Sequence, residues 1–155
     1  MPAPFRTAME AARAAQTLQG PEDRTYAALA HILGAVVGLV TAGLLLPVAA
    51  PTLVLVVHAQ RNPFVLFHVN QAAWFQALVS AVQLVLGVGF FVIYLFTCGL
   101  GAILLIPLIP VFLIGWMLSV LYPAYLAYQA YNGQWAMYPY LGPWVLDQES
   151  PLVAD

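Results

Sequence analysis

Charged side chains are scarce in this chain of 155 residues. Lys, Arg, Asp and Glu together make up 6% of the sequence, and it has no lysine. A soluble domain carries about a quarter of its residues as these four types. Between Ala27 and Tyr131 the single charged residue is Arg61, and an ionised side chain at the centre of a bilayer costs about 2.5–3.5 kcal/mol. The composition, 63% hydrophobic with a mean hydropathy of +0.89, therefore indicates a helical protein that crosses a membrane several times.

Recognisable catalytic and ligand-binding motifs are also missing. The one cysteine, Cys98, forms no internal disulfide and matches no metal-binding spacing. The sequence has no Cys-x-x-Cys, no paired carboxylates among the apolar runs and no phosphate-binding loop, because Gly87-x-Gly89 lies inside an apolar stretch. Four arginines are too few to make a basic surface for nucleic acid. We therefore predict no catalytic residue, no cofactor and no metal site, and expect a protein that is not an enzyme.

The apolar runs predict an all-α, four-helix transmembrane bundle. A polar leader over 1–23 precedes the membrane domain of 24–131, and an aromatic-rich, then acidic, tail over 132–155 follows it. Proline restricts the helix and the residue before it, so Pro47 and Pro51 predict a turn over 46–50. Pro107, Pro110 and Pro123 should kink the last helix. The helices are expected at about 24–46, 51–60, 64–97 and 102–131.

The second of these helices is short. Ten residues span only about 15 Å at 1.5 Å per residue, so this helix crosses only where the bilayer thins, or it follows a re-entrant path. Arginine collects on the cytoplasmic side of membranes. If the first two helices both cross, Arg61 returns to the side of Arg6, Arg13 and Arg24. This arrangement places the protein in the inner (cytoplasmic) membrane with both termini in the cytoplasm.

Two helix faces carry small and polar residues at helical spacing. Small residues let helices approach closely in a membrane, and polar side chains there hydrogen-bond between helices. These faces are therefore expected to pack on each other or to meet a partner protein, while a polar path for a substrate is an alternative. On the first helix they are His31, Gly34, Gly38 and Ala42, and on the third Ala73, Gln76, Ser80, Gln83 and Gly87.

Three histidines lie in or beside the apolar runs. His31 is about two turns into the first helix, where it is expected to hydrogen-bond a neighbouring helix or to lie at headgroup level. A metal or proton-relay role is a third possibility, although no carboxylate occurs among the helices to support it. His58 and His68 flank Arg61 and are expected at the wet interface.

Polar and aromatic residues mark the expected membrane boundaries. Asn62 and Pro63 suit the N-cap and first position of the third helix, and Asn70 follows within it. Tyrosine and tryptophan favour the headgroup layer. We expect an interfacial belt at the end of the last helix, with an aromatic ligand-binding surface as the alternative. The expected loop and interface anchors are Arg61, Asn62, His68, Asn70, Tyr125, Tyr128, Tyr131 and Trp135.

Three separated segments, in this order, resemble a small bacterial integral-membrane family of unknown function that is related to the Tic-type import component of the chloroplast inner envelope. The resemblance implies a four-helix membrane domain and, in the plastid relatives, a link to protein import. This chain departs from the pattern because its loop before 64 carries only Arg61, and 132–139 carries no charge. The segments are Asp23–His31; Asn62–Val65 with His68, Asn70–Ala72 and Phe75–Gln76; and Tyr128–Gln134 with Tyr138–Pro139.

The sequence thus predicts a non-enzymatic integral membrane protein, an accessory or scaffold subunit. Its expected partners are the lipid bilayer and either further copies of itself or other membrane subunits. The alternative is a protein-translocation or transport component with a polar path near His31 and Gln76. A path predicts a water-accessible cavity between the first and third helices, and a scaffold predicts a dry, packed bundle.

Overall fold

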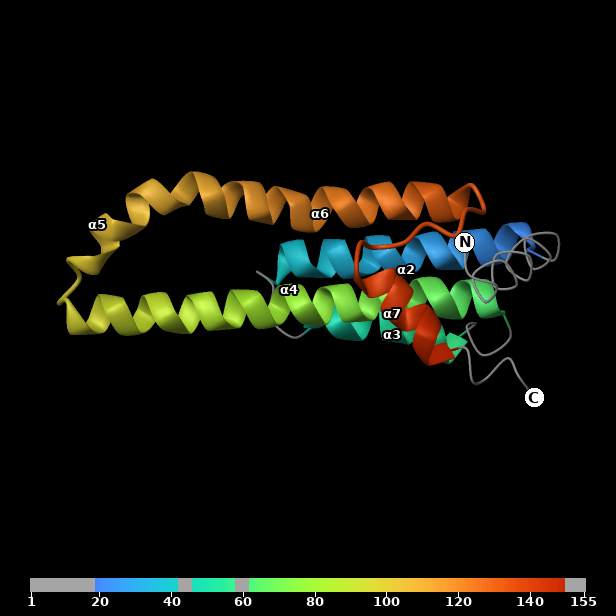
Figure 1. The fold of residues 1–155 in the computed structure, drawn as a ribbon, viewed down its shortest axis with the longest axis horizontal. Coiled ribbons are helices and arrows are strands. Elements are labelled where there is room, and N and C mark those ends of the chain that lie inside the picture. The colour runs from blue at the N-terminus through green and yellow to red at the C-terminus, as the bar shows by residue number, and fades with distance from the viewer. Residues whose placement is uncertain (1–18, 42–45, 58–61, 150–155) are drawn as a thin grey trace.

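The computed structural model describes residues 19–41, 46–57 and 62–149, and within them every regular element is helical. Three stretches among them are long and apolar enough to cross a membrane: Pro21–Val40, Pro63–Phe96 and Gly101–Tyr131. The expectation of four crossing helices is thus supported for three. The elements are α2 (Pro21–Val40), α3 (Leu46–Val57), α4 (Pro63–Phe96), α5 (Gly101–Leu105), the 3-10 turn η2 (Ile106–Leu108), α6 (Ile109–Tyr131) and α7 (Leu141–Glu149) (Figure 1).

The starts of α2 and α4 follow from local chemistry. The first N–H groups of a helix have no intrahelical acceptor. At α2 the Asp23 carboxylate accepts a hydrogen bond from the backbone N–H of Gly20 (2.9 Å). At α4 the side-chain oxygen of Asn62 accepts one from Phe64 N–H (2.9 Å), and Pro63 occupies the first turn. Both helices therefore begin where a capping side chain and a proline coincide.

The short helix α3 differs from the sequence-based expectation. It covers Leu46–Val57 rather than 51–60, so 46–50 is helical and not a turn. Pro47 is the second residue of α3, where its missing N–H has no helical partner to lose. Pro51 lies inside the helix and is fully buried. Proline is tolerated inside a membrane helix where neighbouring helices pack around it.

The prolines of the last helix act differently from one another. Pro107 lies in η2, which separates α5 from α6, and Pro110 lies in the first turn of α6. Pro123 is inside α6 and is buried, and the helix continues past it to Tyr131. Gly133, at φ +75°, then ends α6 in a Schellman turn, with Gln134 N–H donating to the Gln129 carbonyl.

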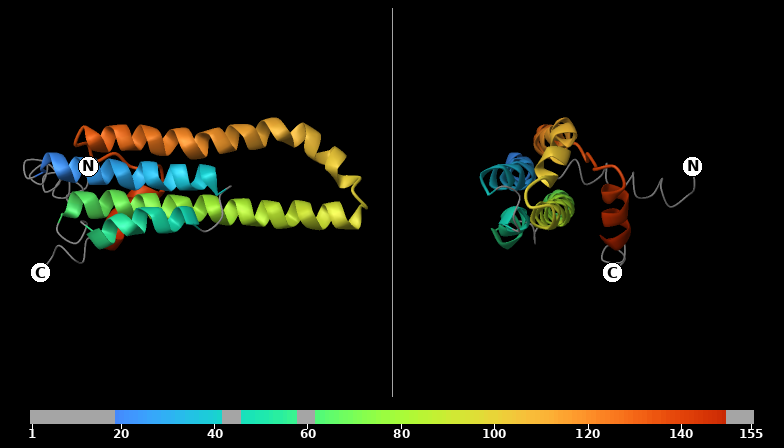
Figure 2. Two further views of the ribbon diagram at one scale, coloured as in Figure 1. Left: turned by 180° about the vertical axis from the view of Figure 1, so that it is seen from behind. Right: turned by 90° about the vertical axis from the view of Figure 1, so that its left-hand side faces the viewer.

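The helices divide into two regions, which lie end to end along the long axis in Figures 1 and 2. In the packed head, defined as 19–80 and 119–149 without the undescribed residues, α2 packs against α3, α4 and α6. The remaining apolar hairpin, residues 81–118, is the second half of α4, α5, η2 and the first part of α6. It extends beyond α2 and α3, and Gly101 alone is buried among its described residues.

Buried apolar side chains are concentrated in the head. His31, His68 and Gln71 are buried among them and form the site described below. The chain after Gly133 folds back over this core and leads into α7, which lies across the bundle (Figure 2). We call residues 134–140 the fold-back segment. The main buried side chains are Ala27, Ala30, Phe64, Val65, Phe67, Val69, Ala72, Leu126, Ala127, Ala130 and Tyr138.

Candidate functional site: a buried polar network in the head

Two histidines from different helices meet inside the head. His31 of α2 and His68 of α4 are both 0% exposed. Their Nε2 and Nδ1 atoms lie 3.0 Å apart, and their rings meet edge to face. His31 thus contacts a neighbouring helix, and His68 is buried rather than at the wet interface where the sequence analysis places it. The reason is that the fold-back segment covers this end of α4, which no local pattern in the sequence reveals.

A tyrosine from the fold-back segment completes the network. The Tyr138 hydroxyl lies 3.2 Å from Nδ1 of His31, and its backbone N–H donates to Oε1 of Gln71 (3.0 Å). Its ring stacks on Phe75 with centroids 4.3 Å apart. Burial raises the pKa of the Tyr138 phenol well above its usual range, and the nearby Tyr122 raises it further. The phenol therefore keeps its proton.

The direction of the hydrogen bonds follows from that proton. Among the described residues, His31 Nδ1 is the one partner of the Tyr138 hydroxyl, so the phenol hydrogen is bonded only when the hydroxyl donates to that nitrogen, and we assign this direction. A neutral imidazole has one donor and one acceptor nitrogen. His31 consequently carries its hydrogen on Nε2 and donates to Nδ1 of His68. His68 accepts at Nδ1 and therefore carries its own hydrogen on Nε2. This N–H is the last donor in the series of hydrogen bonds that begins at Tyr138.

The Nε2 atom of His68 has no acceptor at ordinary hydrogen-bond geometry in the described structure. His68 Nε2 and Gln71 Nε2 are both buried without a hydrogen-bond partner in the described structure, although the backbone of Gln134 lies beside the His68 ring. Phe64 and Phe67 flank that ring edge to face, with centroids 4.6 and 5.3 Å away. The network is therefore short and enclosed by aromatic rings.

This arrangement joins three segments of the head. Since a buried polar group that loses its partner costs about 1–3 kcal/mol, each member holds the others in place. Among the described residues there is no group of three or more His, Cys, Asp or Glu that could bind a metal ion. Because its hydrogen bonds join residues of all three segments, the network holds α2, α4 and the fold-back segment together.

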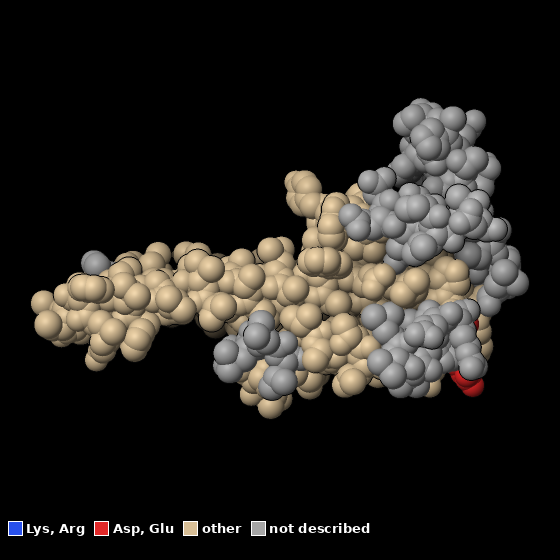
Figure 3. All heavy atoms as spheres, turned by 90° about the horizontal axis from the view of Figure 1, so that it is seen from below, with Lys and Arg blue, Asp and Glu red and all other residues tan. Residues whose placement is uncertain are grey.

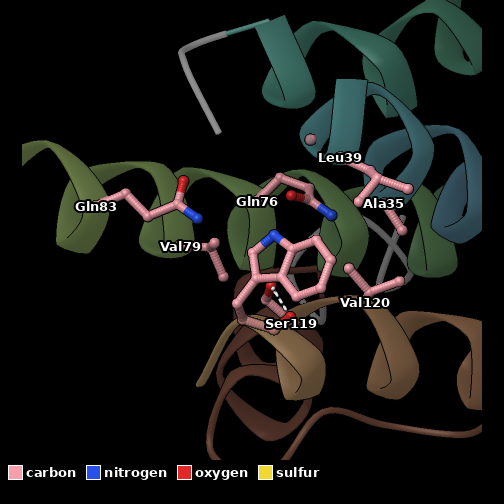
Figure 4. A pocket seen from close by; sticks show the side chains of 9 residues that line it. Ala35, Leu39, Gln76, Val79, Gln83, Ser119 and Val120 are labelled. Carbon is pink, nitrogen blue, oxygen red and sulfur yellow. Dashed lines mark hydrogen bonds between the residues drawn. The ribbon is translucent and has the colours of Figure 1, made fainter. Parts of the chain in front are cut away.

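A second polar contact lies further along α2 and α4. A Cβ atom added at Gly34 would lie 2.9 Å from Cγ of Gln76, and one at Gly38 would lie 3.7 Å from its Oε1. The glycines therefore let the Gln76 side chain lie against α2. Figure 4 shows Gln76 and Gln83 beside Ser119 of α6, around a cavity of about 10 Å³. That volume holds about one water molecule.

The other predicted face residues lie apart from this contact. Ser80 is buried, and its hydroxyl has no described hydrogen-bond partner, as is also true of Oε1 of Gln83. Gly87 is exposed in the hairpin, with nothing within 4 Å of an added Cβ. Ala42 lies outside the described residues. The structure thus packs the predicted stripe from Gln76 to Ser80, places Gln83 at the edge of the cavity and leaves Gly87 uncovered.

The predicted loop and interface anchors differ in their exposure. Tyr125, Tyr128 and Tyr131 are exposed on α6, and Trp135 is half-buried against Phe64 and Phe67. Asn62 caps α4, and Asn70 is half-buried. Arg61 and His58 lie outside the described residues.

Sequence reasoning missed the roles of Gln71 and Tyr138 in the network. Both occur in the segments that carry the family resemblance. From sequence alone, however, Tyr138 cannot be distinguished from the interfacial aromatic residues near it. The available signal was its position five residues after Gly133, since a helix-ending glycine lets the following chain turn back over the helices.

Together these features define a small α-helical integral membrane protein whose polar groups bind its own helices together. Residues 22–145 match the magnetosome magnetite crystal formation protein family, MamF/MmsF, and the chain belongs to that family. No curated protein and no solved structure matches the chain.

The family assignment refines the expectation from sequence. It supports a small bacterial membrane protein and places it in a magnetosome family. The relation to the Tic-type import component gains no support from it.

Proposed function

We propose that the protein is a non-enzymatic accessory or scaffold subunit of a bacterial membrane, which contributes to magnetite crystal formation by associating with itself or with other membrane proteins. The family description supplies the process. The scaffold role is supported by the closed interior of the head. Both termini are proposed to face the cytoplasm, because Arg24 stands at the end of the bundle where α2 begins.

The observation that carries the proposal is the small volume beside Gln76. A path for ions or polypeptide needs continuous water between helices, and the cavity at this point is about 10 Å³. Ala35, Gly38 and Leu39 line it from α2, and Val79 and Val120 line it from α4 and α6. A packed contact with room for only about one water molecule supports a scaffold.

The alternative is a transport or translocation component with a polar path. It is favoured by Ser80 Oγ and Gln83 Oε1, which are buried without a described hydrogen-bond partner and lie one and two turns from Gln76 along α4. Gln83 already lines the cavity, and opening of α2 away from α4 would widen it.

A double variant separates the two functions. Replacing Gln76 and Gln83 by leucine (Q76L/Q83L) removes both amides at nearly constant volume. Under the scaffold proposal, cells that carry only this variant still form magnetite, and the proteins that co-purify with it change in amount. A path predicts loss of magnetite at an unchanged level of the protein in the membrane.

The matched control is Gln129→Leu, the same chemical change on α6 outside the cavity. Gln129 donates to the Tyr125 hydroxyl on the exposed face (2.7 Å), so both proposals predict no effect on magnetite. Loss of magnetite in Q76L/Q83L but not in the control would overturn the scaffold proposal. Purification of the wild-type protein in mild detergent as a single monomer, without partners, would also count against it.

A further inference from the structure

Aromatic side chains from four segments lie at one level of the head. Tyr138 of the fold-back segment stacks on Phe75 of α4 and lies 5.5 Å, between ring centroids, from Tyr122 of α6. Trp74 of α4 meets Trp144 of α7 at 5.0 Å. We call this the aromatic level. Tyrosine and tryptophan collect where hydrocarbon meets headgroups, and α7, lying across the bundle here, has the orientation of an interfacial helix.

The two helical stretches beyond the aromatic level have the length of a bilayer. From Phe75 to the end of α4 at Phe96 is about 32 Å at 1.5 Å per residue. The stretch from Gly101 to Tyr122 covers the same number of residues on the returning side. The hydrocarbon core of a bilayer is about 30 Å thick. Two independent lengths therefore place the core between the aromatic level and the α4–α5 turn.

The opposite placement is excluded by the hydrophobic effect. If the head filled the hydrocarbon core, the hairpin would stand in water with Val85 71% and Phe96 86% exposed. Each large apolar side chain left in water costs about 1.5–3 kcal/mol relative to burial. Most hairpin residues are apolar and exposed, so the sum over both helices far exceeds any compensating term.

In this placement α2 stops within one leaflet. Gly38 lies beside Gln76, and Leu39 lines the same cavity as Val79 and Gln83. The end of α2 at Val40 therefore lies about six residues, or about 9 Å, past the aromatic level. Half of the hydrocarbon core is about 15 Å. The connection from Thr41 to Pro47 contains no charged residue, so it is suited to hydrocarbon.

We propose that α2 and α3 form a re-entrant hairpin, so that the protein is a wedge that favours curved membranes. Four helices occupy the leaflet next to the aromatic level and two occupy the other. With a helix diameter of about 10 Å, the two extra helices add roughly 160 Å² to one leaflet. Such a shape fits a membrane that is convex on the Arg24 side. The wedge follows from the depth of α2 and does not depend on the scaffold role.

The depth of α2 is tested with single-cysteine proteins in sealed vesicles. The native Cys98 is exposed in the α4–α5 turn, so a membrane-impermeant thiol reagent should label wild type from the far side. The variant Thr41→Cys/Cys98→Ser should stay unlabelled from either side until detergent is added. Labelling of this variant from the far side, at a rate comparable to that of Cys98 in wild type, would show that α2 crosses fully and would overturn the proposal.

The consequence is tested by sorting between vesicles of one lipid composition and different diameters. A dye on Cys98 reports the protein, and an external quencher identifies molecules whose Arg24 end faces outward, because their dye stays protected. Their density per unit of lipid should rise at least about twofold from large to small vesicles, since wedge-like insertion is sensitive to curvature. Molecules of opposite orientation serve as the internal control and should show the reverse trend. Densities independent of diameter would overturn the wedge.

Discussion

The packed head and the apolar hairpin are continuous along α4 and α6, yet their interiors are built differently. In the head, Phe64, Phe67 and His68 are almost completely buried. In the hairpin, large apolar side chains face outward, and a groove of about 350 Å³ opens between α4 and α6. Two stretches of the same helices thus differ in packing although both are apolar.

The solvent that surrounds each region explains this difference. Burial of apolar side chains is driven by their removal from water, so a region that meets water and headgroups requires a core. Lipid chains are as apolar as leucine and supply no such drive. The head therefore packs like a soluble domain, and the hairpin needs only two helices of sufficient length. Figure 3 agrees, since the visible acidic atoms lie at the head end alone.

The largest expected contrast comes from deleting one phenyl ring in each region. Phe67→Ala empties a fully buried site in the head and should lower the free energy of unfolding by about 3–5 kcal/mol. Phe91→Ala, at a site 62% exposed in the hairpin, should change it by less than about 0.5 kcal/mol. Denaturant titration in detergent, followed by tryptophan fluorescence, measures both. Equal losses would show that the hairpin has a packed core of its own.

A charged substitution should have the larger effect in the hairpin and the smaller effect in the head, the reverse of the phenylalanine deletions. Val85→Arg places a guanidinium on the lipid-facing surface of the hairpin, 71% exposed, and should cost about 2.5–3.5 kcal/mol of membrane insertion. Tyr128→Arg, at a site 66% exposed on the head, should have little effect. The fraction of each variant that integrates into membranes measures this. Similar integration of both would place the hairpin outside the hydrocarbon.

Adding a side chain at a glycine tests packing more gently. Gly34→Leu forces atoms into Gln76, whose Cγ is 2.9 Å from the position of the new Cβ. It should separate α2 from α4 and cost about 1–3 kcal/mol. Gly87→Leu has open space around it and should be neutral or slightly stabilising, because leucine favours helix over glycine by about 1 kcal/mol or less. The same titration compares them, and a loss at Gly87 would contradict the open face.

The sequence predicted the class of the fold more fully than the site. Apolar runs and the nearly charge-free span specify helices, and Asn62–Pro63 marks a helix start by local chemistry. Pro51 was misread, because a fully buried proline is held by its tertiary neighbours. His68 was placed at the interface, and the role of Tyr138 was missed, for the same reason. Their burial depends on the fold-back segment, and contacts between residues 107 positions apart, as for His31 and Tyr138, leave no local pattern.

The smallest expected effect concerns the Tyr138 hydroxyl, which ties the fold-back segment to the head. Tyr138→Phe keeps the stack on Phe75 but leaves Nδ1 of His31 without its donor, and should cost about 1–2 kcal/mol. The pKa of Tyr138 is raised in the folded protein. The unfolded chain therefore loses this proton first, above its ordinary pKa of about 10, while the folded protein keeps it.

Unfolding then becomes easier as pH rises above about 10, because the unfolded state binds fewer protons than the folded state. The other tyrosines are common to both proteins, so the difference in stability between wild type and Tyr138→Phe isolates this proton. That difference should be constant at neutral pH and shrink at alkaline pH. A difference that stays constant through the alkaline range would show that Tyr138 titrates as an ordinary exposed phenol, and that the head is open to water where the hairpin begins.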